Sequence, residues 1–258
     1  METNPGPWHP IPAVCRILYS SVGSSVACLT MLLFCSETLV SDIRHVSELL
    51  VPGFGCPLLL CQSKMPQARL MVAYIRYGYG AFHQPKFECG CCEMLVFRVC
   101  DTRQNLYVYS FYRNPDLDDR IFDCLLASMA AVQAEDVCAS FLFVWDLNVH
   151  QEWLGSTTMN SHGVAAFDLA TVSGCDPLVV GPTHAHGGTL DLLKTDVPDL
   201  VRVVVVAPIG NSDHSSLSAV ISMALAVPNL CVSRKVFLKY QVNWNMYCLW
   251  CNTGTALM

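Results

Sequence analysis

Polar side chains follow several apolar segments of the chain, at the point where each segment ends. Residues 141 to 145 are all apolar, and Asp146, Asn148 and His150 come directly after them at alternate positions. An apolar run of this kind is typical of a strand buried on both faces of a sheet. Alternate residues of a strand point to the same side, so these three groups can converge on one ligand. The alternative interpretation is a buried strand followed by an ordinary polar turn.

Three other segments end in the same way. Glu37 follows an apolar run, Tyr112 closes the alternating run NLYVYSFY, and the pair Asp213 and His214 follows VRVVVVA. Strand ends are the usual place for a site in an open α/β sheet, which makes Glu37 a candidate metal ligand. The competing interpretation of Glu37 is an acidic charge near the start of a short helix expected over residues 41–50.

These residue types together suit the hydrolysis of a phosphodiester. Carboxylate oxygens bind hard divalent cations such as Mg²⁺. An Asp beside a His can orient the imidazole, and Asn and Tyr side chains can hydrogen-bond a phosphate. Asp146 can activate a water molecule for in-line attack.

The spacing of apolar residues predicts the elements that position these groups. Short apolar or alternating runs between residues 14 and 111 are separated by Pro, Gly and charged clusters, which predicts a strand-rich region. A helix is expected over 118–134, because apolar residues recur there at helical spacing, at Ile121, Leu125, Met129 and Val132. With a strand on each side, this helix forms a βαβ unit and predicts parallel pairing in a mixed sheet.

The second half of the chain alternates in a similar manner. HGVAAFDLA, from His162, reads as a helical segment, and a loop is expected over 183–188. Strands are expected at 178–180, at 201–207 and at 218–225, and Asp191 stands in an apolar context within residues 189–195. Taken together, the sequence predicts one α/β domain with its polar groups at strand ends.

Composition limits the class of protein. The 258 residues are 53% hydrophobic and only 14% charged, which fits one large domain with a sizeable core. No segment reaches the roughly 18 to 20 uninterrupted apolar residues that span a bilayer, so a soluble protein is expected. The opening METNPGPWHPIPAV is acidic and rich in proline, which does not fit a secretory signal. An intracellular protein, in the nucleus or the cytoplasm, is therefore expected.

Cysteines, histidines and net charge add little direct chemistry. The fifteen cysteines have no repeated spacing, which favours reduced thiols over a disulfide framework. His184 and His186 stand at the spacing of a zinc pair, but zinc needs three or four ligands and no others lie nearby in the sequence. The net charge of −6 means that binding to nucleic acid requires a local basic patch.

An ordered series of short motifs resembles the endonuclease/exonuclease/phosphatase superfamily. More closely, it resembles the apurinic-type endonuclease domain of non-LTR (LINE-like) retrotransposons. The motifs are SET at Ser36, FYRNPD from Phe111, DLN at Asp146, WLGS at Trp153, HGVAAFDLA at His162, PTH at Pro182, GGTLDLL at Gly187 and NSDHSSL at Asn211. They run in register from about Glu37 to about Leu225, and the series is more specific than any one motif.

The resemblance implies a fold and an activity. The fold is an α/β two-sheet sandwich of mixed sheets with outer helices over residues 15–227, after a flexible lead-in (1–14) and before an irregular tail (228–258). The activity is a Mg²⁺-dependent endonuclease, with Mn²⁺ as a substitute, that nicks DNA to leave a 3′-hydroxyl for reverse transcription. DNA is the implied partner, and neither a membrane nor a further small-molecule cofactor is implied.

The resemblance also implies a role for individual residues. Glu37 matches the metal-binding glutamate, Tyr112 the tyrosine near the scissile phosphate, and Asp146 the acid that positions the attacking water. Asn148 matches the phosphate-binding asparagine. The remaining matches are Thr183 and Asp191 in the loop flanking the site, Asp213 with His214 as the closing dyad, and Ser212 as a supporting hydroxyl.

The chain departs from the family pattern at two places. The family's first strand usually ends in an asparagine, where this chain offers Ser20 or Ser21. The family usually has glycine before the central aspartate, where this chain has Trp145. A bulky ring there is expected to crowd the phosphate or to shift Asp146, and glycine in its place to raise nicking. The alternatives are a catalytically impaired nucleic-acid-binding module, or a phosphatase acting on a small or lipid phosphoester.

Overall fold

The computed structural model describes residues 14–20, 29–39, 54, 58–60, 69–76, 80–89, 93–100, 104–113, 120–151, 161–208 and 212–222. The expected lead-in up to residue 13, the helix expected over 41–50 and the tail at 228–258 lie outside the described residues. The domain boundaries themselves stay a prediction.

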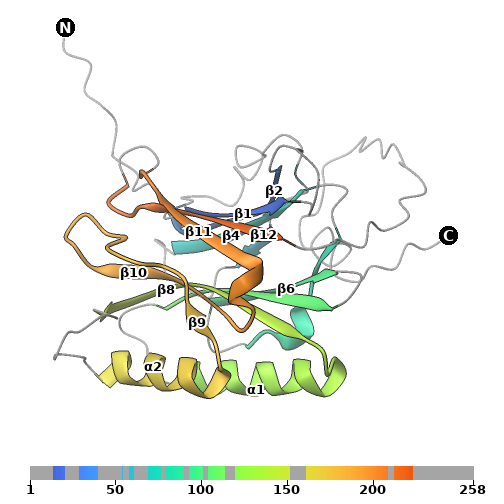
Figure 1. Cartoon of the computed structure of the whole chain (residues 1–258). Helices are drawn as coiled ribbons and strands as arrows, with labels where there is room; N and C mark the ends of the chain where they lie inside the picture. The colour runs from blue at the N-terminus through green and yellow to red at the C-terminus, as the bar shows by residue number, and fades with distance from the viewer. Residues whose placement is uncertain are drawn as a thin grey trace, which may run out of the picture.

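Two six-stranded sheets form the body of the molecule (Figure 1). The first has the order β11 (Val201–Val206), β12 (Ser216–Ser222), β1 (Val14–Ser20), β2 (Leu29–Leu39), β4 (Arg69–Ile75) and β3 (Leu58–Leu60). The second has the order β5 (Ala81–His83), β6 (Glu93–Cys100), β7 (Asn105–Tyr112), β8 (Ser140–Gln151), β10 (Thr189–Thr195) and β9 (Asp176–Pro177). Each sheet is mixed, because β1 pairs with β12 and β7 with β8 in parallel and the other pairs are antiparallel.

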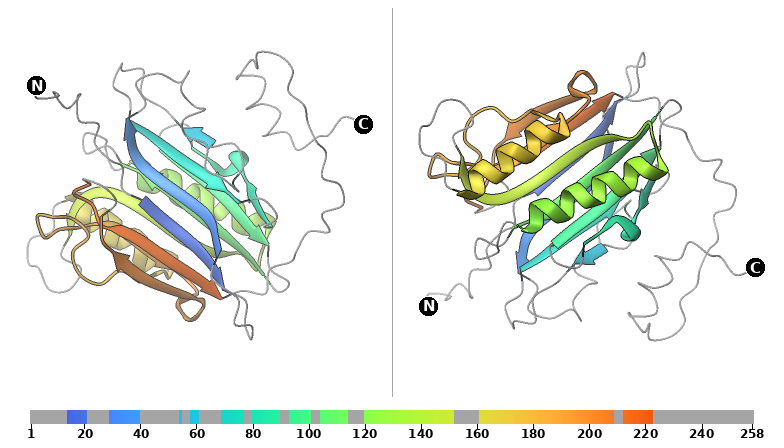
Figure 2. Two further views of the ribbon diagram at one scale, coloured as in Figure 1. Left: turned by 90° about the horizontal axis from the view of Figure 1, so that it is seen from above. Right: turned by 90° about the horizontal axis from the view of Figure 1, so that it is seen from below.

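Two helices, α1 (Arg120–Glu135) and α2 (Ser161–Ser173), lie against the outer face of the second sheet (Figures 1 and 2). Two short 3₁₀ turns, η2 (Pro85–Phe87) and η3 (Pro198–Leu200), lie between strands. The expected α/β two-sheet sandwich of mixed sheets with outer helices is thus confirmed. Among the described residues, no helix is long and apolar enough to cross a membrane.

The predicted βαβ unit is present as β7, α1 and β8, with β7 and β8 parallel. All four apolar residues that predicted α1 are at most 5% exposed, namely Ile121, Leu125, Met129 and Val132. They pack in the apolar layer between α1 and the second sheet. Their spacing of three and four residues places them on one helix face, which explains why the helix docks on the sheet.

The prediction of a strand over residues 178–180 is wrong. The strand in this region is β9, two residues earlier, and it pairs with Lys194 and Thr195 at the C-terminal end of β10. The pairing of β9 with β10 ends at a backbone hydrogen bond from the Leu178 amide to the Leu193 carbonyl, at 2.8 Å. The chain then leaves the sheet, and Gly181 has a φ of +93°, a conformation that a strand residue does not adopt.

Alternation along β8 divides its residues between two apolar layers. Phe141, Phe143 and Trp145 face the helices, whereas Leu142 and Val144 face the first sheet. Every residue from 141 to 146 is buried, as expected for a strand with layers on both sides. Asp146, which follows Trp145, therefore lies on the face between the two sheets.

The expected crowding of the site by Trp145 is wrong. The indole is 2% exposed and packs on the helix side of the sheet, with its ring centroid 4.9 Å from that of Phe111 and 5.2 Å from that of Phe143. The Lys194 Nζ lies 5.4 Å from the same ring. Because successive strand residues point to opposite faces, the indole and the Asp146 carboxylate lie on opposite sides of the sheet.

Candidate active site

Three predicted residues stand in one row across the second sheet. Tyr112, the last residue of β7, pairs with Asp146 of β8, which in turn pairs with Asp191 of β10. Side chains that are directly opposite each other in paired strands share a face. All three are buried, at 4%, 4% and 6% exposure. The row therefore lines the sheet edge at which β7 ends, on the side that faces the first sheet.

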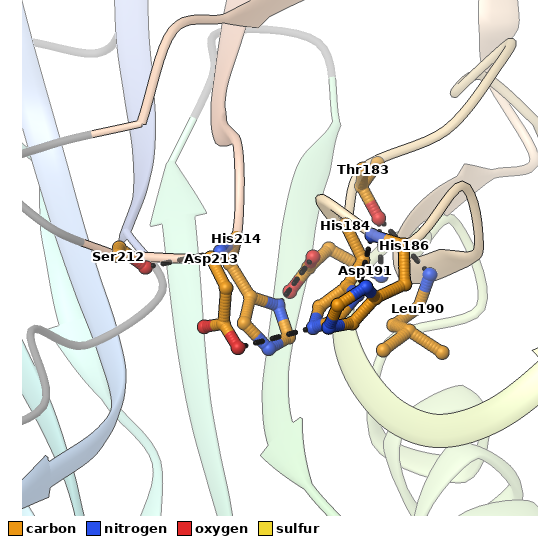
Figure 3. Close-up of polar contacts among 8 residues, drawn as sticks. All are labelled: Thr183, His184, His186, Leu190, Asp191, Ser212, Asp213 and His214. Carbon is orange, nitrogen blue, oxygen red and sulfur yellow. Dashed lines mark hydrogen bonds and ion pairs between the residues drawn. The ribbon is translucent and has the colours of Figure 1, made fainter.

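The segment just before β12 of the first sheet brings His214 to the same place. His214 Nδ1 lies 2.9 Å from Asp191 Oδ2, and both side chains are less than 10% exposed (Figure 3). Asp146, Asp191 and His214 have ligand atoms within 4.8 Å of one another. Two carboxylates and one imidazole from two sheets thus meet in a buried cluster.

The contact to His214 differs from the expected one. Sequence adjacency suggests that Asp213 orients the imidazole, but the carboxylate that accepts the hydrogen bond of His214 Nδ1 is that of Asp191. Asp191 was expected in a loop flanking the site and lies instead within β10. The Asp213 side chain is 65% exposed, and its Oδ2 lies 3.2 Å from Nε2 of His184.

Thr183 holds the start of β10 in place. Its side chain is fully buried, and its Oγ1 accepts hydrogen bonds from the amides of Leu190 and Asp191, both at 3.0 Å. The ladder between β10 and β8 is interrupted between Thr189 and Asp191. The hydroxyl therefore anchors the backbone of Asp191 at the point where the regular ladder is broken.

Ser212 supports His214 from the other side. Its Oγ accepts a hydrogen bond from the His214 amide at 3.1 Å, which closes a two-residue turn just before β12. This contact agrees with the supporting role that the sequence assigned to Ser212. Ser212 acts on the backbone of His214, whereas Asp191 contacts the imidazole.

The groups around Asp213 lower the pKa of its carboxyl group and so favour the ionised form. Partial burial alone would raise the pKa of its carboxyl group, but hydrogen bonding to its own backbone amide and the nearby His214 and His184 rings outweigh that effect. The net result is a pKa below the ordinary value of aspartate. A negative charge consequently stands at the exposed side of the cluster.

His184 is the residue whose contacts sequence reasoning missed. It was considered only as half of a zinc pair with His186, yet it contacts Asp213 and lies edge-on to His214, with ring centroids 4.9 Å apart. His184, Asp213 and His214 have ligand atoms within 4.8 Å of one another. The sequence feature that could have identified His184 is its place in the motif PTH, directly after Thr183. That motif belongs to the series that was assigned to the site.

The side chains of Glu37 and Asn148 lie outside what the structure describes, but their strands are placed. Asn148 lies in β8 beyond Asp146. Glu37 lies in β2 two residues beyond Cys35, which pairs with Val14 of β1. Because β1 runs parallel to β12, this end of β2 meets the edge at which β12 begins, just after His214. The topology thus brings Glu37 to the same edge of the first sheet as His214.

The donor set suits a hard divalent cation. Asp146 and Asp191 contribute carboxylate oxygens, the ligands that Mg²⁺ and Mn²⁺ prefer, and a third carboxylate, that of Glu37, belongs to a strand ending at the same edge. The imidazole of His214 is held through Nδ1 by the Asp191 carboxylate. The cluster thus holds side chains of the types that can bind a divalent cation and transfer protons.

No family model matches the chain, and no curated protein matches it. Similar solved structures include the endonuclease domain of TRAS1, a telomere-specific non-LTR retrotransposon, with 14% identity, 83% of this chain and 100% of that chain covered, and a TM-score of 0.53.

Two further structures are similar. The catalytic domain of Xenopus laevis APE2 has 10% identity, 78% of this chain and 86% of that chain covered, and a TM-score of 0.55. The 3′-5′ exonuclease NExo of Neisseria meningitidis has 11% identity, coverages of 75% and 90%, and a TM-score of 0.51. At these identities the similarity concerns the fold, and it agrees with the strand order and layers described above. The protein has the endonuclease/exonuclease/phosphatase fold.

Proposed function

We propose that the protein is a Mg²⁺-dependent phosphodiester hydrolase that nicks DNA and leaves a 3′-hydroxyl. The observation that carries this proposal is the buried pair of Asp191 and His214 beside Asp146. Burying two carboxylates with an imidazole is costly, and such clusters are retained mostly where they do chemistry.

Each residue of the cluster has a role in the proposed reaction. Asp146 accepts a proton from water, and the water oxygen attacks phosphorus in line with the 3′-oxygen. The bond from phosphorus to the 3′-oxygen breaks, and this oxygen takes a proton from solvent to become the 3′-hydroxyl. Asp191 fixes the His214 ring through Nδ1, so Nε2 faces the phosphate and donates to a phosphoryl oxygen. The carboxylates of Asp191 and Asp213 both lie near the ring and favour the positive charge that this donation requires.

The remaining predicted residues bind or support the substrate. Tyr112 stands at the end of the row and Asn148 just beyond it, where each can hydrogen-bond the phosphate. Thr183 and Ser212 hold the backbones of Asp191 and His214. Glu37, with Asp146, would hold Mg²⁺, with Mn²⁺ as a substitute. When bound, the cation neutralises charge that develops on the phosphate and on the leaving oxygen.

The similar structures support a nucleic-acid substrate. Their names describe an endonuclease domain and a 3′-5′ exonuclease, which act on DNA or RNA ends or internal bonds. The retrotransposon domain is covered over its full length, and this chain also carries the ordered motif series that resembles such domains. These points favour DNA over a small or lipid phosphoester.

A nicking assay tests the proposal. The wild-type protein is expected to convert supercoiled plasmid to the open circle with Mg²⁺ and to stop when EDTA is added, and the nicks are expected to prime a DNA polymerase without end repair. Asp146→Asn and His214→Ala are expected to lower the rate by at least about 100-fold, because each removes a proton-transfer or charge-stabilising group. The exposed Asp199, in η3 beyond the far end of β10, gives the matched control Asp199→Asn.

Three results would count against the proposal. They are no nicking by the folded wild-type protein, nicking that survives His214→Ala, and nicks that cannot prime synthesis. DNA binding without nicking would instead favour the impaired nucleic-acid-binding module. That module is favoured by the absent asparagine at the end of the first strand and by the acidic net charge. Trp145 does not favour it, because the indole packs on the helix side of the sheet.

A further inference from the structure

Two loops of the site run beside each other and are joined through their backbones. The Ala185 amide donates to the Asp213 carbonyl at 2.8 Å, and the Ser215 amide donates to the Thr183 carbonyl at 2.6 Å. Between these bonds, His184 and His214 form an antiparallel bridge. Residues paired in this way project on the same side, which explains why the two imidazoles meet at 4.9 Å with an interplanar angle of 81°.

The surroundings of His184 fix which ring nitrogen carries the proton. The backbone amide of His186 donates to His184 Nδ1 at 3.2 Å, so Nδ1 is an acceptor. The neutral ring then carries its hydrogen on Nε2, and this is the atom that lies 3.2 Å from Asp213 Oδ2. His184 is therefore a hydrogen-bond donor to Asp213, and this contact is marked by a dashed line in Figure 3.

The hydrogen bond that His184 Nδ1 accepts from the His186 amide argues against His184 as a metal ligand. A histidine that binds a metal through Nε2 needs a lone pair there, and it usually donates its other N–H to a neighbouring acceptor. At His184 the Nδ1 atom receives a hydrogen bond instead, which places the hydrogen on Nε2. The cluster of His184, Asp213 and His214 is thus arranged for donation to a carboxylate.

We propose that His184 is a positioning residue that holds the Asp213 carboxylate beside His214. The Asp213 side chain is 65% exposed, so without a tether it samples several rotamers in water. The Nε2–H of His184 selects the rotamer that keeps the carboxylate within 4.8 Å of the imidazole. This inference rests on the proposed function for its kinetic consequence, and the geometry of the donor does not depend on it.

Kinetics with paired variants test the role. Gln places an amide N–H close to the position of His Nε2, whereas Leu fills similar space with no donor. His184→Leu is expected to lower kcat for nicking about 10-fold with KM for DNA unchanged, and His184→Gln to stay within about 3-fold of the wild type. Equal losses in both variants, or a loss carried by KM alone, would overturn the positioning role.

A spectroscopic measurement keeps this test separate from that of the proposed function. In ¹⁵N-labelled protein with EDTA, the ring nitrogens of His184, assigned by their loss in His184→Gln, are expected to report the Nε2–H tautomer. Asp213→Leu is expected to shift the Nε2–H signal, because its acceptor is gone. An Nδ1–H tautomer, or a signal indifferent to Asp213→Leu, would refute the proposal even in an active enzyme. A protein that cleaves no DNA but gives the expected spectra would refute only the proposed function.

Discussion

At the scale of single residues, the central contact joins Asp191 to His214, which are 23 positions apart in the chain. The adjacent Asp213 forms its described hydrogen bond with His184 instead. Successive residues of an extended chain turn to opposite sides, so a facing partner comes more readily from another strand than from the next position. A sequence motif that contains Asp and His side by side therefore identifies the site without identifying the pair.

For glycine at position 145, the structure predicts the opposite of what the sequence predicts, which is a rise in nicking. Trp145→Gly removes an indole from the layer between β8 and the helices, so the free energy of unfolding is expected to fall by about 3–5 kcal/mol. Urea unfolding followed by circular dichroism measures this change. Nicking is expected to fall or stay unchanged, and a stable variant that nicks faster would show that the indole obstructs the site after all.

Lys194 predicts a dependence of stability on pH. Its side chain is fully buried beside Trp145, and burial lowers the pKa of its ammonium group to about 7. Between that value and the ordinary 10.5 the unfolded chain binds more protons than the folded one, so stability is expected to rise with pH over this interval. One such group contributes at most about 1.4 kcal/mol per pH unit.

Lys194→Met isolates this contribution. The variant is expected to be more stable than the wild type near pH 7 by about 1 kcal/mol or more, and to lose that part of the pH dependence. Lys86→Met is the matched control, because Lys86 is 54% exposed and pairs with Glu135 at the surface. Parallel unfolding free energies for the wild type and Lys194→Met from pH 7 to pH 10 would rule out a buried ammonium at this position.

At the scale of elements, the loop before β10 fixes the position of this strand. Thr183 accepts the amides of Leu190 and Asp191 where the ladder with β8 is interrupted. Thr183→Val keeps the shape but leaves two amides without this acceptor, at a cost of about 1–3 kcal/mol. Thr183→Ser keeps the hydroxyl and is expected to lose less than half as much in the same denaturation assay. Equal stability of the Val variant and the wild type would show that the hydroxyl does not anchor β10.

The sequence predicted most elements because each carries a local pattern. The helical spacing of Ile121 to Val132 identified α1, and the apolar run at 141–145 identified β8. The sequence did not predict β5 and β9, because strands of three and two residues are too short to show a period of alternating apolar residues. The face on which Trp145 lies was also missed, since an all-apolar run hides the alternation that would assign it.

At the scale of the whole molecule, the site exists only because two sheets meet at one edge. Asp146 and Asp191 come from the second sheet, and His214 precedes β12 of the first. Glu37 lies in β2, whose end reaches the same edge as the start of β12. The sequence could name these residues through the motif series, but their pairing depends on strand order between sheets, which no local pattern encodes.

The single-turnover nicking rate of Asp191→Asn tests this account most directly. The substitution keeps the size of the side chain but removes the charge that holds His214 Nδ1 at 2.9 Å. We predict a rate about 10² to 10⁴-fold below that of the wild type, with an unchanged circular dichroism spectrum and with Asp199→Asn at wild-type rate. A rate for Asp191→Asn within about 3-fold of the wild type would contradict the assignment of the Asp191 and His214 pair as the catalytic centre.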